Sequence, residues 1–197
     1  MFLFEVPSDT LIRDFLASQR DLAFTYSAVG SSQKGKPPAG FNVDHTRARL
    51  GAGREAFEAG REALCHWKQF DLGWVKAGPS QTPIEVGQVI AVWATILGVA
   101  VINACQIVYV IYDDGPMTRY GFAYGTLPGH IESGEERFMV EWDRASNDVH
   151  YDILAFSRPR HWTARLGYPF ARLQQRRFAR DSAVAMQEAV AAVTGRR

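Results

Sequence analysis

Hydrophobic and polar positions alternate with a period of two through most of the chain after residue 70, which predicts strands rather than helices. The expected strands cover residues 72–77, 86–97, 101–112, 119–126, 135–142 and 149–157. Strong turn sequences separate them, above all Asp-Asp-Gly-Pro at 113–116 and Ser-Asn-Asp at 146–148. The pattern therefore predicts a set of mostly antiparallel strands, to which residues 22–29 add an earlier strand and residues 30–40 a polar loop.

Apolar residues return at helical spacing in three other segments. A short helix is expected around residues 11–16, with Ser8 or Asp9 as its N-cap. A second helix is expected over 48–70, capped by Asp44 and broken at Gly51 or Gly53. A long helix over 169–193 closes the chain, with one apolar face made by Phe178, Ser182, Met186, Ala189 and Val193.

The order of these elements is strand, helix, six strands and a long C-terminal helix. A highly curved antiparallel sheet that grips the last helix would bury the apolar face of that helix. The sequence therefore predicts an α+β helix-grip fold of about seven strands, commonly with a cavity between sheet and helix. At 197 residues we expect one domain over 1–197, with residues 1–21 as an N-terminal helical extension.

One expected strand carries aromatic side chains at alternate positions and very small residues between them. The aromatic positions are Tyr120, Phe122 and Tyr124, and the small ones are Gly121, Ala123 and Gly125. Such a strand has one aromatic face and one nearly bare face, and a bare face usually marks a close approach to the backbone. We expect room for the C-terminal helix or a ligand on the bare face, and Tyr26 and Tyr124 to reach a cavity.

A loop with four ionisable side chains follows this strand, namely His130, Glu132, Glu135 and Glu136. These residue types suit a general acid–base pair or a metal site, whereas the alternative is a solvated acidic loop shaped by prolines and glycines. The His-x-Glu spacing is short and common, so we expect no metal and no cofactor. The candidate catalytic residues are His130 and Glu136, and the candidate ligand-binding residues are Tyr26, Phe122, Tyr124, His130 and Glu136.

The formal net charge is +1, but it is unevenly distributed. From Arg158 onward there are nine arginines and two acidic residues, a balance of +7, so residues 1–157 carry −6. Such a basic C-terminal segment is compatible with binding of nucleic acid or with binding of an anionic head group at a cavity mouth. It is also compatible with internal ion pairs to Glu55, Glu58 or Glu62. Near-neutral total charge and few aromatic residues among the arginines favour ion pairs over nucleic acid. The arginines spaced four apart are Arg172, Arg176 and Arg180.

The 27 residues between Glu85 and Asp113 carry no charge and are long enough to span a bilayer. Their many valines and isoleucines, interrupted by amide side chains, favour two buried strands instead. The first residues lack the basic region of a signal peptide, and the two cysteines, Cys65 and Cys105, lack paired spacing. We therefore expect a soluble, cytoplasmic protein without a membrane span.

Several segments resemble the family DUF1990, also called UPF0548. They are FTYSAVG at 24–30, WKQFDLGW at 67–74, FAYGTLPGHIESGEERF at 122–138, AFSRP at 155–159, LGYPF at 166–170 and RRFARDSAVAM at 176–186. The resemblance covers nearly all of residues 24–186 and departs locally at the uncharged stretch 99–103. It implies membership of the superfamily of START-like and Bet v 1-like (SRPBCC) helix-grip proteins. It implies no activity, because none is established for the family.

These observations support three hypotheses of different classes. The first is a protein that binds an apolar or amphipathic small molecule between the sheet and the C-terminal helix. The second is an enzyme on the same scaffold, of the cyclase, hydratase or hydrolase type, with His130 and Glu136 as acid and base. The third is a nucleic-acid or protein interaction module that uses the arginine row. The sequence leaves the ligand, any catalysis and the oligomeric state open.

Overall fold

A computed structural model of the chain describes residues 1–96, 98–160 and 168–195. The strands in the described part are β1 (Phe2–Leu3), β2 (Asn42–Ala52), β3 (Val75–Gly78), β4 (Val89–Ile96), β5 (Val99–Asp113), β6 (Met117–Thr126), β7 (Glu132–Asp143) and β8 (Asp148–Pro159). The helices are α1 (Asp9–Gln19), α2 (Gly53–Cys65) and α4 (Tyr168–Thr194), with short 3-10 turns η1 (Ser31–Lys34) and η2 (Lys68–Phe70).

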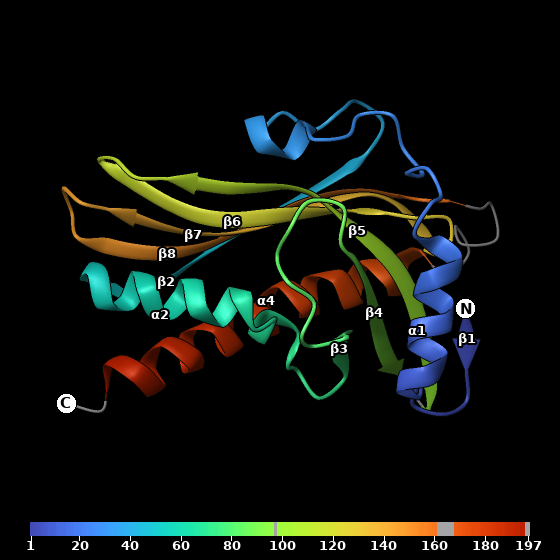
Figure 1. The fold of residues 1–197 in the computed structure, drawn as a ribbon. Helices are drawn as coiled ribbons and strands as arrows, with labels where there is room; N and C mark the ends of the chain where they lie inside the picture. Colours follow the sequence, from blue (N-terminus) through green and yellow to red (C-terminus); the bar gives the residue numbers. More distant parts are fainter. Residues whose placement is uncertain (97, 161–167, 196–197) are drawn as a thin grey trace.

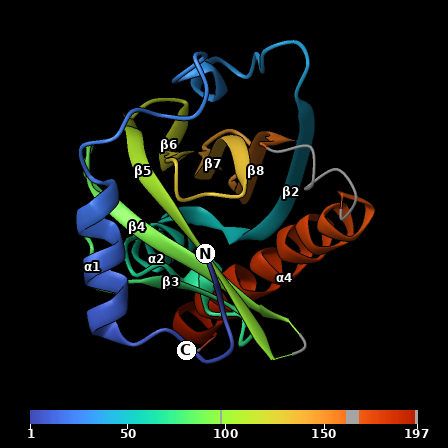
Figure 2. The same cartoon turned by 90° about the vertical axis from the view of Figure 1, so that its right-hand side faces the viewer.

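All strands belong to one antiparallel sheet with the order β2-β8-β7-β6-β5-β4-β3, and β1 pairs with the start of β5. Two register shifts, in β5 between Ile107 and Tyr109 and in β2 between Arg49 and Gly51, bend these long strands. Figures 1 and 2 show the sheet curving over α2 and α4, which lie along the same face. The predicted helix-grip arrangement of a curved antiparallel sheet and a long C-terminal helix is confirmed.

The main core lies between the sheet and these two helices. The aromatic face of β6 points into it and meets the ring of Phe70 from η2, whereas the bare face had been expected to receive the C-terminal helix or a ligand. Phe70 in turn lies 5.4 Å from the Phe138 ring and 5.2 Å from the Phe178 ring, measured between centroids. A second cluster lies on the opposite face of the sheet, where α1 packs Ile12 and Leu16 against β4 and β5. The aromatic contacts therefore fix α4 and η2 against the middle of the sheet.

Both predicted terminal helices are present. The side chain of Ser8 accepts a hydrogen bond from the Leu11 N–H at 3.2 Å, so Ser8 is the N-cap of α1. In α4, burial follows a spacing of four residues and reaches Met186 and then Val190. Val193, predicted on this face, is 52% exposed because the apolar stripe has moved around the helix by that point.

The helix predicted over 48–70 is wrong in its first part. Residues up to Ala52 form β2, which pairs with β8 along its whole length, and α2 begins only at Gly53. Gly53 has φ of +80°, a conformation that glycine adopts readily, and it ends the strand sharply. Asp44, predicted as the helix cap, therefore lies within β2 and pairs with Arg172 of α4 instead.

The strand predicted over 22–29 is also wrong. This segment is a loop that crosses the sheet on the face opposite the helices, visible above the sheet in Figure 1. Its alternating aromatic residues pack on that face: Phe24 and Tyr26 contact the position of Gly125. The expected space on the bare face of β6 is thus filled by this loop. A Cβ at Gly125 would lie 2.2 Å from the Tyr26 hydroxyl oxygen.

The uncharged stretch before Asp113 forms β4 and β5, as predicted. Leu97, where the first of these strands was expected to end, lies outside the described residues. Among the residues that the structure describes, no helix has both the length and the apolar character needed to cross a membrane.

Candidate functional site

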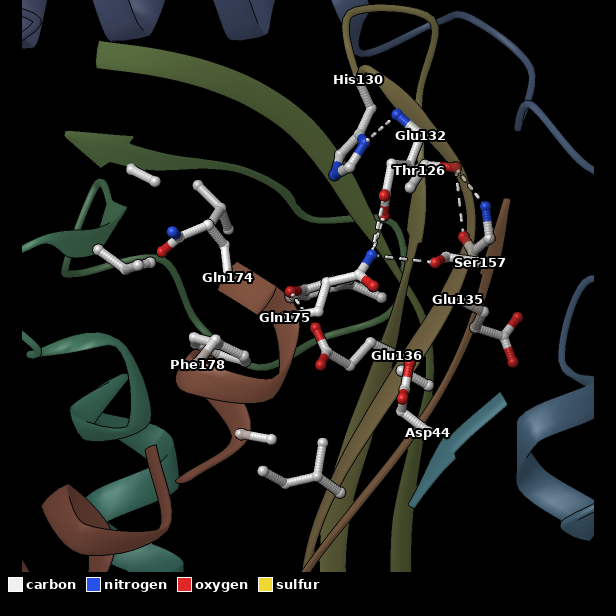
Figure 3. A pocket seen from close by; sticks show the side chains of 18 of the residues that line it. Asp44, Thr126, His130, Glu132, Glu135, Glu136, Ser157, Gln174, Gln175 and Phe178 are labelled. Carbon is white, nitrogen blue, oxygen red and sulfur yellow. Dashed lines mark hydrogen bonds between the residues drawn. The ribbon is translucent and has the colours of Figure 1, made fainter. Parts of the chain in front are cut away.

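A cavity of about 210 Å³ lies between the sheet and the first half of α4 (Figure 3). Its walls are mainly apolar and include Phe70, Trp74, Val75, Val92, Ile153 and Phe178. Its polar side chains include Asp44, Tyr124, His130, Glu132, Glu136, Ser157, Gln174 and Gln175. The cavity is therefore an apolar chamber with one polar wall.

The alternation of β7 creates this polar wall. Glu132 and Glu136 share the face of the strand that also carries Phe138, so their side chains point toward α4. Glu135 has the opposite parity, and Figure 3 shows its carboxylate turned away from the other labelled side chains. The side chains of Glu132 and Glu136 therefore face the cavity, and the side chain of Glu135 faces the other side of the sheet.

Glu136 lies deep in the protein but keeps part of its surface open to the cavity. The Tyr124 hydroxyl donates a hydrogen bond to its Oε2 at 2.7 Å. Burial raises the pKa of Glu136 to about 7, although the Tyr124 hydrogen bond partly opposes this effect. Near neutral pH this carboxyl group can therefore accept or release a proton.

Glu132 is held by the side chain of Gln175 from α4. The Gln175 Nε2 donates to both Glu132 carboxylate oxygens, at 2.8 and 2.7 Å, and also lies 3.2 Å from the Ser157 Oγ. Burial raises the pKa of Glu132 as well. This amide connects α4 to two neighbouring strands and closes one side of the cavity.

His130 stands at the end of the polar wall, in the turn before β7. Its Nδ1 accepts a hydrogen bond from the Glu132 N–H at 2.9 Å, so the neutral ring carries its hydrogen on Nε2. Burial lowers the pKa of His130 to about 4, and the ring is therefore neutral at pH 7. In this state Nε2 is a hydrogen-bond donor rather than a base.

Two further residues of α4 lie beside the polar wall. Arg172 makes an ion pair with Asp44 of β2, which joins the helix to the edge strand of the sheet. The side-chain oxygen of Gln174 is buried and accepts no hydrogen bond from any residue that the structure describes. Figure 3 shows the Gln174 amide turned away from the carboxylates of Glu132 and Glu136.

The structure brings together three of the five predicted ligand-binding residues, since Tyr124, His130 and Glu136 all line the cavity. Phe122 is fully buried behind it, in contact with the Trp67 ring. Tyr26 lies on the opposite face of the sheet, where its hydroxyl donates to the Glu135 carboxylate at 2.7 Å. The predicted set thus divides between the cavity, the core and the outer face.

The sequence analysis missed the contribution of the C-terminal helix. Gln174 precedes Phe178 by four residues and Gln175 precedes it by three, which places each amide beside Phe178 on the helix surface. This spacing was a usable signal, because two amides preceded the predicted apolar stripe. Asp44 was missed because it had been assigned to a helix cap.

Several of the described arginines of the C-terminal region have contacts within the protein. Arg158 lies over the Phe41 ring at 4.4 Å from its centroid, and Arg177 lies over the Trp74 ring at 4.2 Å. Arg177 and Arg180 both pair with Asp181 of their own helix. Arg165 lies outside the described residues. These contacts support internal roles for Arg158, Arg177 and Arg180.

Within the described ranges, no group of three or more histidine, cysteine, aspartate or glutamate side chains is arranged to hold a metal ion.

A family model described as a domain of unknown function, DUF1990, matches residues 25–185. A UPF0548 protein of Dictyostelium discoideum is 36% identical over 209 residues, which cover 96% of each chain. A UPF0548 protein of Arabidopsis thaliana is 38% identical over 152 residues, which cover 75% of this chain and 72% of the relative. A third, from Deinococcus radiodurans, is 32% identical over 194 residues, 93% of this chain and 96% of the relative.

A solved structure of low sequence identity shares the fold: a hypothetical protein from Helicobacter pylori has a TM-score of 0.52 at 12% identity, covering 84% of this chain and 99% of its own. A weaker similarity, with a TM-score of 0.45 at 10% identity, is found to Ara h 8.0201, with coverage of 78% and 99%. The matches in sequence extend over most of the chain and include the segment that forms the polar wall of the cavity. The chain therefore belongs to the DUF1990 family, a domain of unknown function.

Proposed function

We propose that this protein binds one small, mostly apolar molecule that carries a polar group, in the cavity between the sheet and α4. The observation that supports this proposal is the composition of the cavity. Apolar side chains from η2, the sheet and α4 enclose a space of about 210 Å³, and hydrogen-bonding side chains are confined to one wall of it. Binding sites for small molecules typically combine an apolar lining with a few placed polar groups.

The volume limits the size of the ligand. An engineered apolar cavity of about 150 Å³ in another protein takes up benzene. A cavity of about 210 Å³ is thus suited to one ring with a short substituent, or to an aliphatic group of similar size. Burying the roughly 150–250 Å² of such a ring at about 25 cal/mol per Å² gives about 4–6 kcal/mol, which corresponds to Kd values from about 1 mM down to tens of micromolar.

The first test is native mass spectrometry of the protein purified from its own host, with two variants for comparison. Ala155 pairs with Glu136 across β7 and β8 and lines the cavity, so Ala155→Phe would fill the space. Ala145 is exposed in the turn between the same strands, and Ala145→Phe is the matched control. We expect a bound small molecule on the wild type and on Ala145→Phe but not on Ala155→Phe.

A wild-type protein without any bound mass needs one further measurement, a titration with 2-phenylethanol followed by ¹⁵N–¹H NMR. Shifts centred on cavity residues in the wild type, and their loss in Ala155→Phe, would support the proposal. No saturable shifts up to about 10 mM, well above the expected Kd, would refute it.

A second candidate is acid–base catalysis on the bound molecule, favoured by the Glu136 carboxyl group with its pKa of about 7. In Figure 3 the Glu132 carboxylate and the Gln175 amide lie between Glu136 and His130, so the two candidate groups would act on different ends of one substrate. With an identified ligand, Glu136→Gln separates the two functions. Catalysis requires turnover to fall by about 10²–10⁴-fold in this variant while the ligand still binds, whereas a binding protein shows no chemical change of the ligand in either form.

A further inference from the structure

We infer that the polar group of the ligand is a hydrogen-bond donor with positive charge, an amine, held by Glu136 and Glu132. This inference rests on the proposed function and deepens it, because it names the chemical class of the ligand. It is carried by the balance of acceptors, donors and charges on the polar wall.

The polar wall has unused acceptors. In the described part of the chain, the Tyr124 hydroxyl is the side-chain donor to the Glu136 carboxylate, and it reaches only Oε2. Glu136 lines the cavity, and its Oε1 has no hydrogen-bond donor among the described residues. The Glu132 oxygens share the single Nε2 of Gln175. A buried acceptor without a donor costs free energy. A ligand that supplies N–H groups would satisfy these acceptors, and the hydrogen bonds would contribute to its binding free energy.

The charges of the cavity lining also favour an amine. Its lining includes three inward-facing or mouth carboxyl groups, Asp44, Glu132 and Glu136, and among the described residues that line it there is no lysine and no arginine. Arg172 reaches the mouth from α4, but its guanidinium is engaged by Asp44. His130 is neutral at pH 7. A ligand carboxylate or phosphate would therefore meet like charges, whereas an ammonium group would meet opposite ones.

Proton exchange by Glu136 follows from the same arrangement. The groups around this carboxyl come from several elements: Tyr124 of β6, Cys105 of β5, Tyr151 of β8, Glu132 of β7 and Asp44 of β2. Glu132 and Asp44 both raise the pKa of Glu136 by their negative charge. A bound ammonium group reverses this effect and lowers the pKa, so amine binding near pH 7 releases a proton.

The test compares three probes that share a phenylethyl skeleton and differ in the polar group: 2-phenylethylamine, 2-phenylethanol and phenylacetate. Isothermal titration calorimetry at pH 7.5 gives the affinity of each for the wild type. We expect the amine to bind at least about tenfold more tightly than the alcohol, and phenylacetate to bind most weakly. Calorimetry in two buffers of different ionisation enthalpy should show proton release for the amine alone.

One variant and a matched control assign the preference to the polar wall. Glu136→Gln is expected to reduce the tenfold preference for the amine to within about threefold and to leave the affinity for the alcohol nearly unchanged. Glu188→Gln changes an exposed glutamate far along α4 and should leave all three affinities unchanged. In the wild type, amine affinity should rise from pH 6 to pH 8 as Glu136 ionises, because the amine stays protonated over this range.

The outcomes distinguish this inference from the proposed function. If the alcohol or the acid binds at least as tightly as the amine, the inference is overturned while small-molecule binding stands. If amine affinity does not rise with pH, or if Glu136→Gln keeps the full preference, the inference is overturned in the same way. If none of the three probes binds the wild type, the proposed function and the inference fall together.

Discussion

Replacing Glu136 by glutamine is expected to stabilise the protein at alkaline pH and to change its stability little in acid. Glu136 is buried, and the Tyr124 hydroxyl is its side-chain hydrogen-bond donor within the described residues. Glutamine preserves the shape of the side chain and still offers an oxygen to Tyr124, so the substitution removes the ionisable group and little else. The variant therefore measures how much the ionisation of the buried carboxyl group lowers the free energy of unfolding.

The sign and size of the effect follow from the pKa. Burial raises the pKa of Glu136 from 4.5 to about 7, so between these values the folded protein holds a proton that the unfolded chain has lost. The stability that this proton provides is fully present below pH 4.5 and is lost as the pH rises through 7. At about 1.4 kcal/mol per pH unit, the full loss is about 3 kcal/mol. For a chain of this length the corresponding change in Tm is about 6–12 °C.

The assay is urea unfolding of the wild type, Glu136→Gln and the exposed control Glu188→Gln at pH 5 and pH 8. The wild type and both variants contain His130, so its titration cancels in the comparison. We expect Glu136→Gln to gain about 2.5 kcal/mol more at pH 8 than at pH 5, since part of the effect is already present at pH 5. The control should show no such difference between the two pH values.

Two results would refute this reasoning. An equal change in stability at pH 5 and pH 8 would mean that Glu136 titrates as an ordinary solvated carboxyl, and the cavity would then be open to bulk water. A loss of stability at pH 8 would mean that the ionised carboxylate holds the fold together. In either case Glu136 would not be a buried carboxyl group with a raised pKa that is available to a ligand.

Three further predictions concern other parts of the molecule, each measured by urea unfolding. Gly125→Ala should lower stability by about 1–3 kcal/mol because its Cβ would meet the Tyr26 hydroxyl, whereas Gly115→Ala, where nothing lies within 4 Å, should have little effect. Gln69→Met should raise stability by about 1–3 kcal/mol, because the buried Gln69 amide has no hydrogen-bond partner among the described residues. His130→Asn should remove about 2 kcal/mol of the stability loss between pH 7 and pH 5, because the unfolded chain binds a proton in this range that buried His130, with its pKa of about 4, does not.

The sequence was a good guide where strands are joined by short, strongly marked turns. The turn at Asp113 to Pro116 joins β5 to β6 and the one near Asn147 joins β7 to β8, so these turns fix the register of two strand pairs, and the alternation then assigns each side chain to a face. Along β7 the alternation puts Phe138 and Val140 opposite Arg137, and in the structure Phe138 and Val140 are in the core while Arg137 pairs with Asp152. Local turn chemistry and period-two patterning were sufficient there.

The sequence was a poor guide where a segment depends on partners far away in the chain. The residues around Arg47 to Leu50 include good helix formers, yet they form β2 because β8, about a hundred residues later, supplies their hydrogen bonds. The loop containing Phe24 and Tyr26 has the alternation of a strand but packs on the space left by Gly125. Neither outcome is encoded in local propensity, since both require contacts that exist only in the folded sheet.

The candidate site shows the same division. Glu136 and Tyr124 could be paired from sequence because a tight connection between two strands puts them opposite each other in register. The contribution of Gln174 and Gln175 could be suspected from helical spacing but not placed, because the position of α4 over the sheet depends on its packing against Phe70 and the edge strand. The strand residues of the polar wall are therefore placed by local pairing, whereas the residues of α4 are placed by tertiary packing.

Glu135 and Glu136 are adjacent, chemically identical and differently used, which is the strongest reason to assign function to the second. The carboxylate of Glu135 accepts hydrogen bonds from the Tyr26 hydroxyl, the Gly30 N–H, the Ser32 N–H and the Ser32 hydroxyl, and these fix the outer loop on the sheet. Glu136, one residue later and on the opposite face, receives the Tyr124 hydroxyl and faces an apolar cavity. A carboxylate with four donors is stabilised by the fold, whereas one with a single donor in an apolar space destabilises it when ionised. An acid that weakens the folded state at neutral pH is more economically explained by a partner outside the chain than by any contact within it.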